Sequence, residues 1–198
     1  MTRTTTTRER LLSAAERLFL ERGFHATSTR DITEAAGANL AAVNYHFRSK
    51  RELMDAVAER VIRPALLGQA EELDRLRARP GAPTVLEIAR AYVGPFVRLT
   101  EGERGDQIAR FVSRVMSEGT EPVRRATGPV EDRFRAELAR ALPGLSAEER
   151  ELRFRAMVGV LLMYGLGLLT QHAPGTSPEQ LTEQIAAFCA GGLASPPA

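Results

Sequence analysis

Apolar residues recur at helical spacing along almost the whole chain, and this pattern limits the fold more than any other feature. Near the N-terminus, Leu11, Ala15, Leu18 and Phe19 lie three or four residues apart, which places them on one face of an α-helix. The alternation of apolar and polar residues that marks a strand never persists. The sequence therefore predicts an all-α fold.

The composition indicates a globular protein outside the membrane. Apolar residues make up 43% of the chain and charged residues 26%, which is an ordinary balance for a folded domain. The longest apolar run, residues 156–169, is too short to span a bilayer. The N-terminus lacks the apolar middle of a secretion signal, and a single cysteine, Cys189, cannot form an internal disulfide. We expect a cytoplasmic protein without a membrane partner.

Three short helices are predicted within the first fifty residues. The first covers residues 7–22. The second begins at a capping hydroxyl, Thr27 or Ser28, and stops at Gly37, and Asn39 is the cap of the third. Two short helices joined by a three-residue glycine turn match the outline of a helix-turn-helix.

A larger helical region is predicted to follow. Ser49 and Glu52 form a capping box for a fourth helix, and Pro64 either lies within this helix or ends it. Further helical segments are expected at residues 65–79, 85–101, 105–118, 121–141, 147–171 and 178–192. We predict a first domain of residues 1–50 and a second of residues 51–198.

The third helix has a slim outer face. A rotation of 100° per residue places Val43 and Phe47 on one side and Ala41, Ala42 and Tyr45 on the other. Such a helix fits the major groove of DNA, which is about 12 Å wide. A merely solvated face explains the same residues. The basic excess of residues 1–63 is modest, with 11 Arg and Lys against 8 Asp and Glu, so both interpretations stand on these residues alone.

The segment from about Arg10 to Leu53, read as LLSAAERLFLERGFHATSTRDITEAAGANLAAVNYHFRSKREL, resembles the DNA-binding domain of the TetR family of transcriptional regulators. The glycine after the first helix, the threonine before the second, the Ala-Gly turn and the motif Tyr-His-Phe-x-x-Lys all fall in register. The resemblance covers roughly the first quarter of the chain. It implies a homodimer in which each subunit has a three-helix reader of double-stranded operator DNA and a larger helical domain for ligand binding and dimerisation.

The resemblance also implies which residues bind DNA. It assigns phosphate or base contacts to ten positions: Thr29, Arg30, Asn39, Leu40, Ala41, Ala42, Asn44, Tyr45, His46 and Lys50. Many members carry a tyrosine where this chain has Asn44, and a serine or threonine with a small residue within positions 39–42, so the base pairs that are read stay open. A helical wheel buries Leu40, whereas the family position lies at the DNA, and both interpretations stand.

A ligand pocket is implied between the middle helices of the larger domain. We expect its lining to be Val93, Phe96, Val97, Phe111, Val112, Val115, Met116, Met157, Leu161 and Tyr164. This set contains no cluster of buried charge, which favours a small apolar ligand. The run NLAAVNYHF with the following SK resembles a branch that includes regulators of lipid metabolism, so a fatty acid or acyl derivative is expected, with other apolar compounds such as drugs and aromatic metabolites as alternatives. Ordinary core packing explains the same side chains.

The predicted helix of residues 147–171 is apolar on nearly every side and must be covered all round. The family architecture places this helix and the last one at the interface between subunits. The residues expected there are Leu162, Leu169, Leu181, Ile185 and Phe188. Burial inside a single chain is the alternative.

Enzyme chemistry is not indicated. Lys50, the only lysine, follows Arg-Ser without a glycine loop, and the histidines at 25, 46 and 172 lack the spacing of metal ligands. A nucleophilic pair of Cys189 and His172 is the remaining catalytic alternative. We expect no cofactor and no metal, and we predict a repressor that a ligand releases from DNA, with activation as the alternative.

Overall fold

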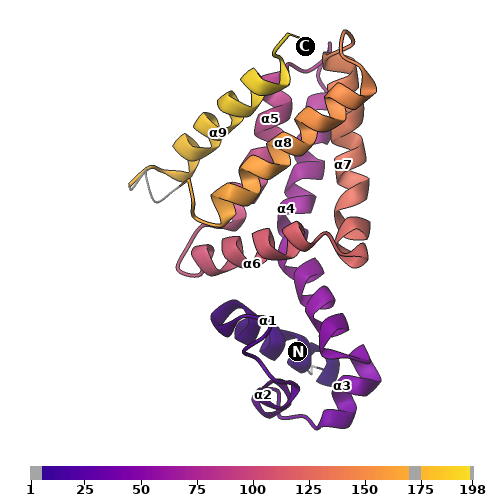
Figure 1. The fold of residues 1–198 in the computed structure, drawn as a ribbon, viewed down its shortest axis with the longest axis vertical. Coiled ribbons are helices and arrows are strands. Elements are labelled where there is room, and N and C mark those ends of the chain that lie inside the picture. The colour runs from indigo at the N-terminus through magenta and orange to yellow at the C-terminus, as the bar shows by residue number, and fades with distance from the viewer. Residues whose placement is uncertain (1–5, 170–174, 197–198) are drawn as a thin grey trace. The chain divides into compact units, whose positions relative to one another are not determined.

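The computed structural model describes residues 6–169 and 175–196, and all regular secondary structure within these residues is helical (Figure 1). The helices are α1 (Thr7–Arg22), α2 (Thr29–Ala35), α3 (Leu40–Phe47), α4 (Lys50–Arg77), α5 (Val85–Leu99), α6 (Gly105–Glu118), α7 (Glu121–Ala141), α8 (Ala147–Gly165) and α9 (Pro178–Leu193). The predicted all-α fold is therefore confirmed. Within the described ranges, no helix combines the length and the apolar character that crossing a membrane requires.

The chain divides into two compact units, Met1–Val61 and Ile62–Ala198. The sequence-based boundary at residue 50 coincides with the start of α4, whereas the division in the structure lies within that helix. Leu53 and Val57, on the first turns of α4, are fully buried, and both fall within the first unit. The first unit therefore consists of α1, α2, α3 and the beginning of α4.

Helix starts follow local capping chemistry. The side chains of Thr6, Ser28 and Asn39 each accept a hydrogen bond from the backbone N–H three residues on, at the starts of α1, α2 and α3. Thr84, Ser146 and Ser177 do the same for α5, α8 and α9, each within a reciprocal capping box. These bonds satisfy backbone donors that have no partner inside the helix. Of the two caps considered for the second helix, Ser28 is the one observed.

Four helices end at a glycine with a positive φ, and after α2 and α8 this glycine forms a pair of capping hydrogen bonds. Gly37 (φ 58°) follows α2, and Gly167 (φ 79°) follows α8. In each case the glycine N–H bonds to the carbonyl three residues back and the next N–H bonds to the carbonyl five residues back, which is the Schellman pattern. The expected helix of residues 147–171 was therefore too long, because α8 ends at Gly165. Residues 170 and 171 lie outside the described residues.

Helix α4 runs without a break through Pro64, so the separate segment expected at residues 65–79 is the second half of this helix. Proline removes one backbone donor and leaves the carbonyl of residue 60 without its helical partner. Pro64 is exposed, so water can reach this part of the helix and bond to a freed carbonyl. Proline at a solvent-facing position therefore does not end the helix.

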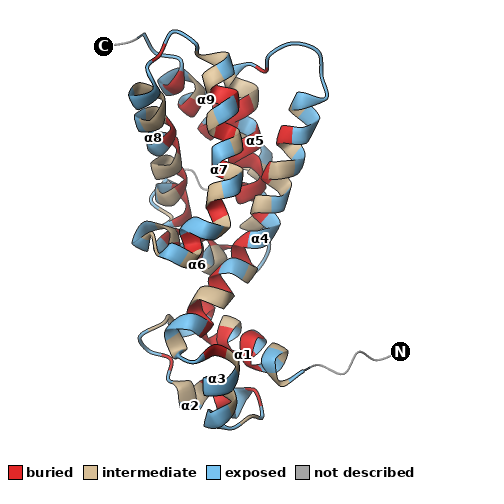
Figure 2. Ribbon diagram, turned by 90° about the vertical axis from the view of Figure 1, so that its right-hand side faces the viewer, coloured by how far each residue is buried: buried red, intermediate tan, exposed pale blue. Residues whose placement is uncertain are grey.

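The second unit is built around α5. Nine consecutive or nearly consecutive residues between Ile88 and Val97 on this helix are buried, and α5 contacts α6, α7 and α9, while α8 contacts α6, α7 and α9. Figure 2 shows this concentration of buried residues along α5. Tyr92 packs edge-on against Phe134 of α7 and Phe154 of α8, with ring centroids 4.9 and 5.5 Å apart. These aromatic contacts join three helices at the centre of the unit.

Candidate DNA-binding surface and ligand cavity

The outer face of α3 is open to solvent in this chain. Tyr45 is 85% exposed and Leu40 is 55% exposed. All ten positions that the resemblance assigned to DNA are at least partly accessible: Arg30, Asn39, Leu40, Ala41, Asn44 and Tyr45 are exposed, and Thr29, Ala42, His46 and Lys50 are half-buried. The side chains that pack inward from α3 are Val43 and Phe47. The burial of Leu40 that the helical wheel predicted is wrong, because this residue is the first of the helix and lies beside its open end.

Two side chains hold the turn before α3, and a capping network holds the start of α2. The Asn39 side chain accepts from the Ala42 N–H at 2.9 Å, and Arg10 of α1 donates to the Gly37 carbonyl at 3.3 Å. On α2, the hydroxyl and backbone N–H of Ser28 both donate to the Asp31 carboxylate. These bonds hold the pKa of Asp31 below its usual range. The geometry of the two helices is therefore fixed by bonds on both sides of the turn.

Thr27 anchors the loop between α1 and α2. Its side chain is fully buried, and its hydroxyl donates to the carbonyls of Gly23 at 2.8 Å and Leu18 at 3.3 Å. From the sequence, this residue was interpreted only as a possible helix cap. A buried threonine after a glycine turn offers no local sign of such a tertiary bond, since the bond depends on how the loop folds back onto α1.

Basic side chains surround the ends of α3. The Lys50 ammonium lies over the Phe24 ring, 4.1 Å from its centroid, and the Arg8 guanidinium lies 5.0 Å from the Phe47 centroid. Arg48, which the sequence did not single out, is exposed and has a φ of 59° between α3 and α4. A positive φ is costly for a residue with a side chain. The sharp turn at Arg48 thus adds a third basic group close to the end of the helix.

The second unit contains a small cavity with a mostly apolar lining. The volume of this cavity is about 30 Å³, which is room for a few waters at most, since one water needs about 10–15 Å³. The lining comes from α4, α5, α6, α7 and α8: Ile62, Ala65, Leu66, Gln69, Tyr92, Phe96, Met116, Thr127, Glu131, Val158, Leu161 and Leu162.

The expected pocket residues divide into three groups. Phe96, Met116 and Leu161 line the cavity. Tyr164 lies in a separate surface groove, where its hydroxyl is 2.8 Å from the Thr100 hydroxyl; burial raises the pKa of Tyr164. The remaining side chains are buried in the core and are absent from the lining of this cavity: Val93, Val97, Phe111, Val112, Val115 and Met157.

Polar side chains line the cavity that the sequence described as apolar. Gln69, Thr127 and Glu131 are all buried, and the Gln69 side chain donates to the Tyr92 carbonyl at 2.8 Å. Burial, with the charge of Glu131 nearby, raises the pKa of Tyr92 far above its ordinary value. The sequence reading considered only apolar residues at helical spacing, so it missed the polar residues that α4 and α7 contribute.

A larger groove adjoins the cavity. It has a volume of about 400 Å³ and shares Met116, Thr127, Glu131 and Val158 with the cavity, so the two spaces have a common wall. Its other lining residues include three arginines: Arg124, Arg135 and Arg155. The cavity and the adjoining groove are together called the composite pocket below.

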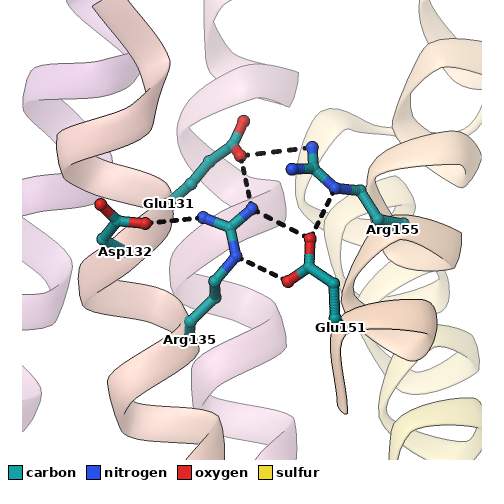
Figure 3. A network of polar contacts seen from close by, with 5 residues as sticks. All are labelled: Glu131, Asp132, Arg135, Glu151 and Arg155. Atoms are coloured by element: carbon teal, nitrogen blue, oxygen red, sulfur yellow. Dashed lines mark hydrogen bonds and ion pairs between the residues drawn. The ribbon is translucent and has the colours of Figure 1, made fainter. Parts of the chain in front are cut away.

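An ion-pair network between α7 and α8 borders the composite pocket (Figure 3). Arg135 donates to Glu151 at 2.7 Å, to Asp132 at 2.9 Å and to Glu131 at 3.0 Å, and Arg155 donates to Glu151 at 2.8 Å. The hydrogen bond from Arg135 holds the pKa of Glu151 below its ordinary value. The arginines at this end of the composite pocket are therefore already bound by carboxylates.

The residues expected at a subunit interface lie on α8 and α9, or just after α8. Phe188 is 71% exposed and Leu169 is 39% exposed, and Leu181 is half-buried. Leu162 lines the cavity, and Ile185 is buried within the chain. Two of the five thus face inward, because each lies on the side of its helix that packs against the rest of the unit.

An exposed apolar stripe runs along α8. Leu152, Ala156, Gly159 and Met163 follow one another at spacings of three and four residues, with Leu152 72% exposed and Met163 44% exposed. The sequence reading had not separated this face of the helix from the buried one. Small residues thus lie between large ones on this stripe, and α9, which contacts α8, carries a further exposed apolar side chain, Phe188.

Reactive groups are sparse in the part of the chain that the structure describes. No group of three or more His, Cys, Asp or Glu residues there is arranged to hold a metal ion. Cys189 is buried, and burial raises the pKa of its thiol to about 11. His172, the other member of the nucleophilic pair considered from the sequence, lies outside the described residues.

Each of the two units matches a family model of bacterial regulatory proteins. Residues 11–57 match the model of the bacterial regulatory proteins, tetR family, and residues 90–192 match that of the tetracyclin repressor-like C-terminal domain. The HTH-type transcriptional dual regulator CecR of Shigella flexneri is 29% identical over 170 residues, which cover 81% of this chain and 76% of the relative.

Solved structures share the fold over nearly the full length. The superantigen PfiT superposes with a TM-score of 0.68 at 24% identity and covers 94% of this chain and 97% of its own. A TetR-like transcriptional regulator from Rhodococcus sp. RHA1 superposes with a TM-score of 0.64 at 18% identity, covering 99% and 100%.

Proposed function

This chain belongs to the tetR family of bacterial regulatory proteins, whose members bind DNA and regulate transcription, and we propose that it is a homodimeric repressor that a small effector releases from a palindromic operator. The exposed outer face of α3 is the observation that carries the proposal. A tyrosine that is 85% exposed on a short, well-anchored helix has little stabilising role within the chain. As a DNA-binding protein, it would act in the cytoplasm.

The roles on DNA follow from the chemistry of each side chain. Tyr45, His46 and Lys50, at and beyond the end of α3, would donate to phosphate oxygens and fix the register. Arg30 and Asn44 would reach base edges, and Leu40 would contact thymine methyl groups. Arg48 joins the phosphate-binding set as a further proposal, since it is exposed and lies between the end of α3 and Lys50.

Dimerisation would use the α8 stripe and Phe188. A C2 dimer needs a self-complementary surface, and small residues such as Ala156 and Gly159 allow two copies of α8 to approach closely. A dimer also supplies the second recognition helix that a palindromic operator requires, with the two readers about 34–36 Å apart.

The effector would bind in the composite pocket and shift the dimer between a DNA-binding state and a released state. Such coupling is typically worth about 1–3 kcal/mol, or about 5- to 150-fold in affinity. A fatty acid or acyl derivative is the effector that the resemblance to lipid-responsive members suggests. The dual regulation in the name of CecR gives activation as a second possible effect on some promoters.

The test is DNA binding by the purified chain to the DNA upstream of its own gene, measured by footprinting and by fluorescence anisotropy over a range of salt concentrations. The variant Lys50→Ala removes one phosphate contact per subunit. The slope of the logarithm of the binding constant against the logarithm of the salt concentration should become shallower by about 0.9 per contact, or about 1.8 for a dimer. Tyr45→Phe should weaken binding without changing the slope, because it removes a donor and no charge.

Arg17→Ala is the matched control. Arg17 is an exposed arginine of α1 that pairs with Glu21 and lies outside the proposed DNA-binding set, so its loss changes the net charge by the same amount. Equal salt slopes for Lys50→Ala and the parent would refute the role of Lys50. Absence of a protected inverted repeat at low salt would refute the proposed function itself.

A further inference from the structure

Helix α7 carries two buried glutamates with different surroundings. Glu137 is 1% exposed, and both of its oxygens are bound, Oε1 by Arg77 at 2.6 Å and Oε2 by Arg140 at 2.9 Å. Glu131 is 6% exposed, and both of its bonds fall on Oε2, from Arg135 at 3.0 Å and Arg155 at 3.4 Å. Glu131 Oε1 has no hydrogen-bond partner among the described residues.

The free oxygen belongs to the composite pocket. Glu131 lines both the cavity and the adjoining groove, and Figure 3 shows its second oxygen directed away from the two arginines. An ionised carboxylate has about four acceptor sites, and the described side chains occupy only those on Oε2 of Glu131. Oε1 is therefore a carboxylate oxygen in the pocket wall to which a ligand can donate a hydrogen bond in place of water.

The surroundings select among ligand head groups. Arg135 already donates to three carboxylates, and Arg155 to two. A ligand carboxylate entering here would meet the charge of Glu131 and would have to displace Glu151 or Glu131 from these arginines. A hydroxyl, amide N–H or ammonium group meets none of these costs and gains a charge-assisted hydrogen bond.

We infer that the composite pocket selects a ligand with an apolar body and a hydrogen-bond-donating head group, which binds to Glu131 Oε1. The inference rests on the proposed ligand-binding function and narrows the ligand class. The apolar body would contact Tyr92, Phe96, Met116 and Leu161. Because the cavity is only about 30 Å³, most of the ligand would lie in the groove unless Met116 and Leu161 move. Among acyl derivatives, amides and hydroxylated chains fit this pattern and free fatty acids do not.

The test compares three probes with the same eight-carbon chain: octylamine, which is an ammonium at neutral pH, 1-octanol and octanoate. Binding to the full-length chain is measured by isothermal titration calorimetry. Octylamine and 1-octanol should bind at least about tenfold more tightly than octanoate, because hydrogen bonds to charged groups are worth that factor or more. Equal or tighter binding of octanoate would overturn the inference.

Two variants locate the effect at Glu131. Glu131→Gln removes the charge but keeps an acceptor. The affinity for octylamine should therefore fall about tenfold or more, while the affinity for 1-octanol should change little. Glu137→Gln is the matched control, since it neutralises the other buried glutamate of α7, which lies outside the pocket lining. This substitution should lower the stability of the fold and leave the order of the three probe affinities unchanged. A loss of octylamine binding in Glu137→Gln that equals the loss in Glu131→Gln would overturn the inference.

Arg155→Gln provides a test that does not depend on Glu131→Gln folding. The Arg155 side chain is 54% exposed, so its replacement should leave the fold intact. Removing this positive charge leaves Glu131 less neutralised and should strengthen octylamine binding relative to octanoate. A shift in favour of octanoate would contradict the inference.

Two separate measurements distinguish a failure of the inference from a failure of the proposed function. DNA binding by the protein without any probe tests the proposed function, and the order of the probe affinities tests the inference. Probes that bind in the expected order but do not release DNA would support the inference and refute the role of this pocket in regulation.

Discussion

The crossing of α6 and α8 allows a quantitative prediction at Gly165. A β-carbon at this position would lie 1.9 Å from the Ser113 hydroxyl oxygen and 2.9 Å from the Ala109 carbonyl oxygen. Contacts this short cannot persist, so Gly165→Ala must push the helices apart or turn the serine. Overpacking of this kind costs about 1–3 kcal/mol, which is reduced by up to about 1 kcal/mol because alanine favours helix over glycine.

Ser113 makes the prediction specific. Its side chain is fully buried, and its hydroxyl has no hydrogen-bond partner among the residues that the structure describes, so Ser113→Ala should be neutral or should stabilise by up to about 1 kcal/mol. The double variant Gly165→Ala with Ser113→Ala loses the 1.9 Å contact but keeps the 2.9 Å contact with Ala109. It should therefore recover part of the lost stability and not all of it.

The assay is urea denaturation of the four proteins of this double-mutant cycle, followed by circular dichroism at one fixed protomer concentration, because dimerisation makes stability depend on concentration. The expected coupling free energy is about 1 kcal/mol in the direction of rescue. Strictly additive changes, or a Gly165→Ala variant as stable as the parent, would show that α6 and α8 are not packed through this glycine.

Three further predictions concern the larger unit. Phe188→Arg should yield monomers in sedimentation experiments. Leu67→Arg, at an exposed leucine on α4, should leave the proposed dimer intact, and dissociation of the dimer by both substitutions would argue against a specific interface. The folded-state pKa of Glu151 is lowered from the ordinary 4.5 by its hydrogen bond from Arg135, so its contribution to stability is present above the unfolded-state pKa and is lost as the pH falls through the folded-state value. Thermal melts below pH about 4.5 should thus show a smaller loss on acidification for Glu151→Gln than for the parent. Because burial raises the pKa of Cys189 to about 11, iodoacetamide at pH about 8 should modify it slowly in the native protein and much faster in urea; equal rates would contradict its burial.

The sequence predicted the helices well because their boundaries depend on local chemistry. The ends of α2 and the start of α3 follow from Ser28, Gly37 and Asn39, each of which acts on backbone groups within five residues. Such signals can be read without knowledge of the tertiary structure. The same locality explains the recognition of the helix-turn-helix, since its two helices and its turn are contiguous in the chain.

Solvent exposure decided two outcomes that the sequence left open. Pro64 was considered either an interior residue or the end of the fourth helix, and it lies on an exposed part of α4, where the helix continues. Leu40 was given two interpretations, and the buried one is wrong, because the first residue of a short helix has little covering it. In each case the residue type was informative, and the missing quantity was how much of the chain surrounds it.

The composite pocket shows why a ligand class is harder to predict than a fold. The sequence pattern gave Phe96, Met116 and Leu161, since apolar residues at helical spacing face inward whatever their function. Glu131 has the opposite character, because a glutamate on a long helix is usually solvent-exposed and its burial depends on Arg135 and Arg155, which reach it from α7 and α8. The side chain that discriminates between head groups is therefore one that no local pattern distinguishes. Its role follows from which of its two oxygens the arginines leave free.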